Sequence, residues 1–349
     1  MHRRLLVILL LASGVSSAAC ERTQSTPDGK RRVTLQLNWF PEPEFGGFYA
    51  ARDNGHFASE GIDIDLRKGG ADVPAGQLVA NGNVDFAIVS GSQLVTLRAQ
   101  GGRATAVFAT FQKSPRALVV KWDSSYQTIE ELWRSDGTIM AQNGLPFIKW
   151  LNQSLGKSNL KFIPYTGSFA PFLQNTVVGM QAFATAEPVQ LESDGIRTRV
   201  FLVADAGFNP YDVIVAVSDR LLEQEPELVT KMVRAMTRGW QDYLASPQPT
   251  NKTIGKLNPD FSPRTLEIAA AALSNFLVSE DTKSNRLGWM TESRWTSLQD
   301  KLVSLGELDP ERRKEIGRIF LNPAWSKDSE PSADETQPVS KGSESASDA

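Results

Sequence analysis

The sequence predicts an α/β fold of two lobes, each a mixed sheet flanked by helices. Short runs in which apolar and polar residues alternate are typical of strands, and longer runs with helical spacing follow them repeatedly. Glycine pairs and prolines separate these runs, as expected of turns. Residues 33–326 lie between two polar ends, and that length suits two lobes better than one compact core.

The first 20 residues are typical of an export signal and are not expected to join the fold. Residues 2–4 are basic, residues 5–12 are almost wholly apolar, and small residues lead up to Cys20. The apolar run is too short to span a bilayer, which indicates a secretory signal peptide. Residues 17–20 resemble a lipobox, although Ser17 stands where an aliphatic residue is common.

Cys20 is the predicted site of lipidation. It is the only cysteine in the chain, so an internal disulfide framework is excluded, and an anchoring role explains both its uniqueness and its position. The alternative is cleavage after Ala19 that leaves the cysteine unmodified. With lipidation we expect a protein exported to the periplasm or cell surface and tied to the membrane through its lipid anchor. Residues 21–32 are expected to form a tether, and residues 327–349 a disordered tail.

The stretch 33–61 places aromatic and acidic side chains between a strand and a helix. Residues 33–38 alternate with a period of two, and two prolines close together then end the strand. A helical run begins near Gly46. In open α/β sheets ligands bind beyond the strand ends, so this stretch supplies candidate ligand-binding residues: Trp39, Phe40, Glu44 and Tyr49.

The rest of the first lobe adds one further candidate, Ser90, in a loop of small residues before a predicted helix at 92–100. It can help to hold a ligand at the helix N-terminus, or it can simply cap the helix, and both alternatives stay open. Strands are predicted at 62–67, 84–89, 104–111 and 117–121, and a helix at 73–81. The crossing into the second lobe is placed near residues 121–125, so that the first part of lobe one is residues 33–122.

The second lobe, predicted as residues 123–204, offers candidates after two of its strands. Tyr165 ends a strand at 162–165, Ser168 and Phe169 follow it, and Glu187 follows a strand at 182–185. A carboxylate at that position would accept hydrogen bonds from an amino-heterocycle, while its alternative role is to form a salt bridge or cap the next turn. The chain is expected to return near 204–209, and residues 205–326 complete lobe one. Tyr211, just after the return, is a further candidate for the cleft.

Several of these segments together resemble the NMT1/THI5-like (SsuA/THI5) substrate-binding proteins of ABC importers. The matching segments are Trp39-Phe40-Pro41, Tyr49-Ala50-Ala51, the run Gly55-x-Phe57-x-x-Glu60-Gly61-Ile62-Asp63-Ile64, and Tyr165-x-x-Ser168-x-x-Pro171-Phe172. The resemblance implies a periplasmic-binding-protein fold of type II that closes on a small-molecule ligand by a hinge motion. It also implies an ABC permease and ATPase as partners.

The favoured ligand is a thiamine pyrimidine precursor or a related heterocycle, because aromatic residues in the cleft suit a ring better than a bare anion. Alkanesulfonate or taurine, nitrate and riboflavin-type ligands are the alternatives within this family. For a sulfonate we would expect an arginine at a strand end, and Arg116 is the nearest to such a position.

Catalysis is hard to build from this composition, so we expect a binding protein and no enzyme, cofactor or metal site. The two histidines are His2, within the signal, and His56, on a predicted surface turn. The net charge of −3 argues against nucleic acid as a partner, and we expect a monomer. Two other classes remain as alternatives: an exported enzyme with Glu44 and Glu187 as its carboxylate pair, and a lipid-anchored ligand sensor.

Overall fold

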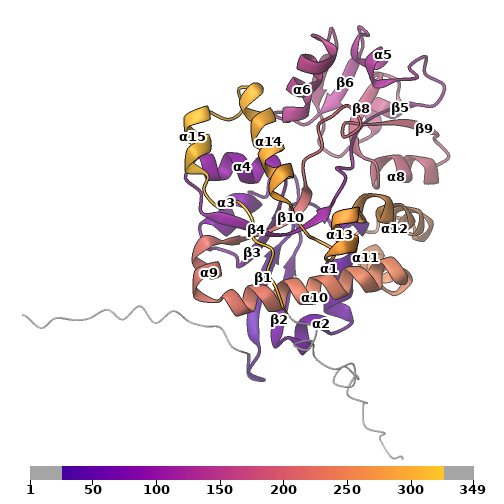
Figure 1. Cartoon of the computed structure of the whole chain (residues 1–349). Coiled ribbons are helices and arrows are strands. Elements are labelled where there is room, and N and C mark those ends of the chain that lie inside the picture. The colour runs from indigo at the N-terminus through magenta and orange to yellow at the C-terminus, as the bar shows by residue number, and fades with distance from the viewer. Residues whose placement is uncertain (1–25, 326–349) are drawn as a thin grey trace, which may run out of the picture.

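The computed structural model describes residues 26–325, which form two α/β lobes, one above the other in Figure 1. The predicted signal, Cys20 and the tail lie outside the described residues. Each lobe contains a mixed sheet of five strands, which confirms the predicted fold class. Lobe one has the strand order β2-β1-β3-β10-β4: β1 (Arg31–Gln36), β2 (Ile62–Arg67), β3 (Phe86–Val89), β4 (Ala104–Phe111) and β10 (Asp212–Ser218). Lobe two has the order β7-β6-β8-β5-β9: β5 (Arg116–Lys121), β6 (Thr138–Ala141), β7 (Lys161–Pro164), β8 (Gly179–Phe183) and β9 (Thr198–Leu202).

The strand that opens lobe one forms as its alternation predicts. Val33, Leu35 and Leu37 are fully buried, whereas Arg32 before them is exposed and Thr34 between them is half-buried. β1 pairs in parallel with β2 on one side and with β3 on the other. The central strands β3, β4 and β10 are buried along their whole length, in keeping with their nearly continuous apolar sequences.

The boundary between the lobes differs from the prediction at the first crossing. β5 pairs with β8 and β9 of the second sheet, so the chain crosses at residues 112–115 and not near 121–125. Both flanking strands are apolar and a Gln-Lys-Ser-Pro segment joins them, a pattern that fits a hairpin within one sheet equally well. The second crossing, at residues 203–211, overlaps the predicted 204–209.

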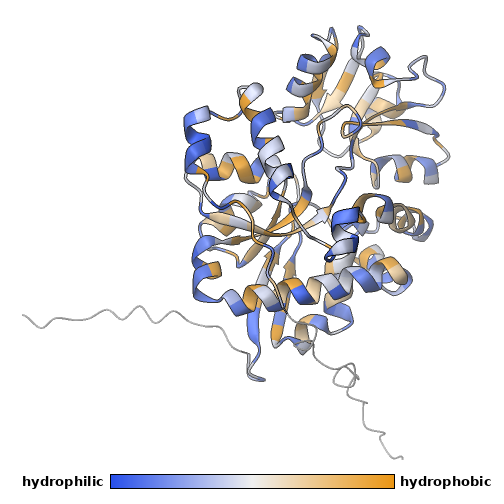
Figure 2. Cartoon of the chain, viewed as in Figure 1, coloured by the Kyte–Doolittle hydropathy of each residue, from blue (hydrophilic) through white to orange (hydrophobic). Residues whose placement is uncertain are grey.

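Helices cover both sheets, and the helices from the C-terminal part of the chain lie around lobe one (Figure 1). In lobe one these are η1 (Pro43–Phe45), α1 (Gly46–Asp53), α2 (His56–Ser59), α3 (Ala75–Ala80), α4 (Gly91–Ala99), α9 (Asp219–Gln224), α10 (Pro226–Ala245), α11 (Gln248–Leu257), α12 (Pro263–Leu277), α13 (Glu280–Ser284), α14 (Glu292–Ser304) and α15 (Pro310–Glu315). In lobe two they are α5 (Ile129–Trp133), α6 (Pro146–Leu155), α7 (Ala170–Leu173) and α8 (Glu187–Ser193). Figure 2 shows hydrophobic residues concentrated on the central strands, while α9, α13 and α15 are largely hydrophilic.

Close packing of α1 on α10 fixes the loop that follows β1. A Cβ on Gly47 would lie 2.1 Å from the Trp240 ring, and a Cβ on Gly239 would lie 2.2 Å from the Gly47 carbonyl oxygen. Both positions require glycine, because the buried Trp240 ring leaves no room for a Cβ on Gly47 and the backbone next to Gly239 cannot move aside cheaply. Trp240 and Tyr243 of α10 are buried in the core of lobe one. The residues between β1 and α1 are therefore held between a sheet and a tightly docked helix pair.

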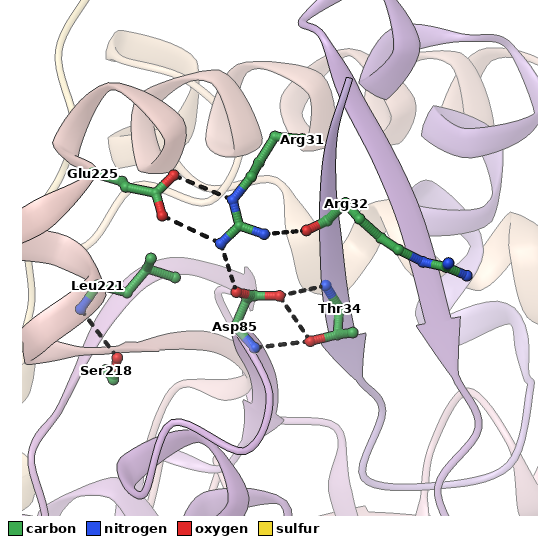
Figure 3. A network of polar contacts seen from close by, with 7 residues as sticks. All are labelled: Arg31, Arg32, Thr34, Asp85, Ser218, Leu221 and Glu225. Carbon is green, nitrogen blue, oxygen red and sulfur yellow. Dashed lines mark hydrogen bonds and ion pairs between the residues drawn. The ribbon is translucent and has the colours of Figure 1, made fainter. Parts of the chain in front are cut away.

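A polar network fixes the other end of β1 (Figure 3). Arg31 donates to Glu225 at the junction of α9 and α10, and its Nη2 lies 3.2 Å from Asp85 Oδ1. The second oxygen of Asp85 accepts from the Thr34 amide at 2.8 Å. β1, the start of β3 and the helix junction thus form one unit. Among residues 26–325, no helix combines the length and the apolar character needed to cross a membrane.

Candidate functional site

A cavity of about 630 Å³ lies between the lobes. Lobe one lines it with the loop after β1, the segment 70–77 and the start of α4, whereas lobe two lines it with Arg116, the turn 142–147 and the segment 164–166. This volume lies within the range usual for pockets that enclose a small organic ligand.

Strand ends from both lobes meet at this cavity. Trp39 follows β1 and Ser90 follows β3, two parallel strands of lobe one. Gln142 follows β6 and Tyr165 follows β7, two parallel strands of lobe two. The carboxyl ends of parallel strands lie at one edge of a sheet, so each lobe presents its binding edge to the other.

The two crossings are joined by a hydrogen-bonded cluster at the base of the cavity. Ser114, on the first crossing, donates through its amide to Asn209 Oδ1 at 2.8 Å and through its hydroxyl to Asp212 Oδ2 at 2.6 Å. The other oxygen of Asp212 lies 3.6 Å from Arg116 Nε. Next to Asp212, Val213 has a φ of 49°, a value that β-branched residues rarely adopt. Backbone strain of this kind is concentrated at functional sites, and here it lies just after the second crossing, next to the cavity-lining Asp212.

Three further carboxyl groups lie close to this cluster, from both lobes. Burial, and then the charges of Glu187 and Asp212, raise the pKa of Glu44 to about 8, with Arg116 acting against them. Burial, followed by the charges of Glu44 and Glu187, also raises the pKa of Glu42 well above its ordinary value. Burial raises the pKa of Glu187 and of Asp212 as well, and Arg116 opposes both shifts. One guanidinium cannot balance four buried carboxylates, so some of them retain their protons at neutral pH.

Glu187 acts mainly on its neighbours in lobe two. It accepts from the Tyr165 hydroxyl at 3.2 Å and from the Phe183 amide at 2.6 Å. Burial, and then the charge of Glu187, raises the pKa of the Tyr165 phenol, so this tyrosine stays an uncharged hydrogen-bond donor. Glu187 therefore holds Tyr165 in position at the cavity wall.

Three of the predicted binding residues line the cavity: Trp39, Ser90 and Tyr165. Ser90 also caps α4, because its hydroxyl accepts from the Gln93 amide while the Gln93 side chain accepts from the Ser90 amide. Of the two roles left open for Ser90, the capping role is thus confirmed. Glu44 and Glu187 belong to the carboxyl cluster and are not among the lining residues.

The other five candidates lie elsewhere. Tyr49 is buried in the core because it lies on the inner face of α1, and Tyr211 is buried against Trp295 of α14, which draws its ring away from the cleft. Phe40 is 46% exposed and contacts Trp39 edge to face. Ser168 and Phe169 lie on the loop before α7, outside the cavity lining.

Asp212 was not among the predicted site residues, and Arg116 was predicted to contact the ligand only if that ligand is a sulfonate. The two residues lie far apart in the sequence, and the two crossings bring them together. One signal was present: Asp212 is a charged residue at the start of an otherwise apolar strand. A buried carboxylate needs a hydrogen-bonding or charged partner, and an arginine at one end of another strand, such as Arg116, can provide one.

Glu44→Gln tests the carboxyl cluster through the pH dependence of stability. Glu44 has a native pKa of about 8 and an ordinary unfolded value, so between roughly pH 5 and 8 the native state binds more protons. The free energy of unfolding should therefore fall as the pH rises through this window, by up to about 1.4 kcal/mol per pH unit for this group.

In Glu44→Gln this fall should become smaller, which urea unfolding at pH 5, 6.5 and 8 would measure. Glu227→Gln, on the exposed face of α10, is the control and should leave the slope unchanged. A wild-type protein whose stability rises from pH 5 to 8 would contradict the assignment.

Comparison with known proteins gives one matching family and several relatives. The family model described as NMT1/THI5 like matches residues 42–250. The riboflavin-binding protein RibY of Chloroflexus aurantiacus is 27% identical over 329 residues, which cover 87% of this chain and 92% of RibY. A formylaminopyrimidine-binding protein of Halalkalibacterium halodurans is 22% identical over 302 residues, 83% of this chain and 90% of that protein. A 4-amino-5-hydroxymethyl-2-methylpyrimidine phosphate synthase of Legionella pneumophila is 21% identical over 273 residues, 75% of this chain and 86% of the synthase.

Solved structures share the fold at lower identity. The alkanesulfonate-binding protein SsuA from Xanthomonas axonopodis pv. citri, bound to MOPS, has a TM-score of 0.62 and 13% identity, and the match covers 84% of this chain and 98% of that one. The periplasmic aliphatic sulphonate-binding protein SsuA from Escherichia coli has a TM-score of 0.61 and 11% identity, covering 89% and 98%.

Proposed function

We propose that this chain, which belongs to the NMT1/THI5-like family, is the extracytoplasmic binding protein of an ABC importer and captures a small planar heterocycle. The observation that carries the proposal is the cavity between two lobes, walled by the ends of parallel strands from both sheets. A site built from two lobes joined by two crossings can enclose a ligand when the lobes move about the crossings.

The residues that line the cavity suit a flat ring with polar edges. Trp39 of lobe one and Tyr165 of lobe two bring an aromatic side chain from each side. Aromatic rings stack on planar ligands and exclude water from them. Amide side chains of Asn38, Gln142 and Asn143 also line the cavity, and each can both donate to and accept from the edge of a heterocycle.

A thiamine pyrimidine precursor remains the favoured ligand, and the formylaminopyrimidine-binding relative supports it. A riboflavin-type ligand is the second candidate. RibY is the relative with the higher identity over a larger share of this chain, and about 630 Å³ is more than a single substituted ring requires. Both candidates are planar nitrogen heterocycles, so they belong to one chemical class of ligand and differ in the size of the ring system.

The remaining parts of the proposal concern export and partners. We propose that cleavage before Cys20 and its lipidation anchor the protein at the membrane surface, next to an ABC permease and ATPase. We also propose a binding role without catalysis, although one relative is named a synthase. Among the described residues, the single histidine is His56, which contacts Asp242 on lobe one at 2.7 Å and does not line the cavity.

A ligand panel tests this function directly. Thermal unfolding of the mature chain should shift upward with riboflavin or with a formylaminopyrimidine, because a ligand at a hundredfold over its Kd adds about 2.7 kcal/mol to the folded state. Thiamine, taurine and nitrate complete the panel. A midpoint unchanged by every heterocycle at millimolar concentration would contradict the proposed ligand class.

A further inference from the structure

Arg116 has an unusual position in the cavity. Of the described residues that line the cavity, it is the only lysine or arginine, and the other charged ones are the acids Asp212 and Glu307. It is the first residue of β5, immediately after the first crossing. An unpaired arginine in such a place would bind sulfonate or phosphate groups strongly, because its planar fork matches their oxygens.

Arg116 is not unpaired, because Asp212 lies against it. Asp212 is 1% exposed, and its Oδ1 lies 3.6 Å from Arg116 Nε. The hydrogen bond from the Ser114 hydroxyl to Asp212 Oδ2, at 2.6 Å, prevents the carboxylate from turning away. On its other side the guanidinium lies over the Phe183 ring, with 5.1 Å between its central carbon and the ring centroid. The charge of Arg116 is thus matched by a fixed partner.

The other possible anion site at the cavity is also occupied. The N-terminus of α4 lines the cavity at Ser90 and Gln93, and helix N-termini attract anions through their free amides. Here the Gln93 side chain accepts from the Ser90 amide at 3.0 Å, and the Ser90 hydroxyl accepts from the Gln93 amide at 3.2 Å. The capping box therefore uses two of the donors that an anion would need.

We propose that Asp212 determines specificity: by neutralising Arg116 it makes the guanidinium a donor for an uncharged carbonyl-type oxygen and excludes sulfonates and phosphate esters. A neutral acceptor gains the N–H donors of Arg116 at little electrostatic cost. An anion at the same point also meets the negative charge of Asp212, which lies 3.6 Å from the guanidinium. The inference rests on the proposed function only in the identity of the neutral ligand.

Asp212→Asn tests this assignment, because asparagine keeps the size and can still accept from Ser114. Calorimetric titration would use two neutral probes, riboflavin and a formylaminopyrimidine, and two anionic probes, hexanesulfonate and MOPS. We expect Asp212→Asn to gain at least tenfold in sulfonate affinity over the wild type. The gain should shrink between 50 mM and 500 mM salt, and Arg116→Gln added to it should abolish it.

Asp219→Asn is the matched control. Asp219 also pairs with a buried arginine of the same chain, Arg98, at 3.0 Å, but it lies outside the cavity. This variant loses an equivalent charge and should bind sulfonates no better than the wild type. Any effect of losing a buried Asp–Arg pair in general would appear in both variants.

Two results would overturn the inference. One is a wild-type protein that binds hexanesulfonate as tightly as any neutral probe, a test that depends on no variant folding. The other is a folded Asp212→Asn protein whose sulfonate affinity is unchanged. If neither neutral probe binds the wild type, the proposed ligand class fails, while a sulfonate gain in Asp212→Asn still supports the role of Asp212.

Discussion

Trp39→Ala should lower the affinity for the bound heterocycle by about ten- to a hundredfold. Trp39 directly follows β1 and lines the cavity from lobe one, opposite the lobe that carries Tyr165. Stacking of a heterocyclic base on an aromatic side chain contributes about 1–3 kcal/mol, and each 1.4 kcal/mol is about tenfold in affinity. Calorimetry with the ligand identified from the panel would measure the loss.

Trp122→Ala is the control for this prediction. Trp122 is 49% exposed, lies in lobe two just after β5 and does not line the cavity. Its removal should leave the affinity within about twofold of the wild type. An equal loss in both variants, or an unchanged affinity in Trp39→Ala, would place the ligand somewhere other than this cavity.

Glu60→Ala should reduce the free energy of unfolding by about 3–5 kcal/mol, the range expected when one partner of a buried ion pair is removed. Glu60 and Arg234 are 5% and 7% exposed, and Arg234 Nε donates to Glu60 Oε1 at 2.6 Å. A second arginine, Arg238, lies 3.9 Å from the same oxygen. The pair joins the end of α2 to α10, on which α1 also packs.

Urea unfolding would measure this effect, with Glu227→Ala as its control. Glu227 pairs with Lys231 on the exposed face of α10 at 3.0 Å, and exposed pairs of this kind contribute about 0.3–0.5 kcal/mol. A loss below about 1 kcal/mol in Glu60→Ala would show that the buried pair is not what holds α2 against α10.

The elements that could be predicted from the sequence are those whose pattern is set locally. The alternation of residues 33–38 predicted β1, and the strands predicted at 62–67 and 104–111 are β2 and β4. Glu60 belongs to the segment that carries the family resemblance, and the structure gives it a packing role. Local patterns of this kind predict secondary structure because a strand and a helix each place side chains on one face with a fixed period.

The cavity was only partly predictable, because it depends on which strands pair. Residues at or just after strand ends are expected near a binding site, and Trp39, Ser90 and Tyr165 do line the cavity. Tyr211, which was predicted from its place just after the return to lobe one, does not line the cavity, because its ring packs against Trp295 of α14. The pairing of Arg116 with Asp212 could not be predicted, because the sequence does not show that β5 leaves the sheet of β4.

A crystal structure of the protein with its heterocycle would show where the ligand binds. We predict a ring between Trp39 and Tyr165, with an uncharged ligand oxygen within hydrogen-bond distance of Arg116, and Asp212 still paired with that arginine. A ligand bound outside the space between the lobes would contradict the proposed site, and a ligand whose negatively charged group lies against Arg116 would contradict the proposed role of Asp212.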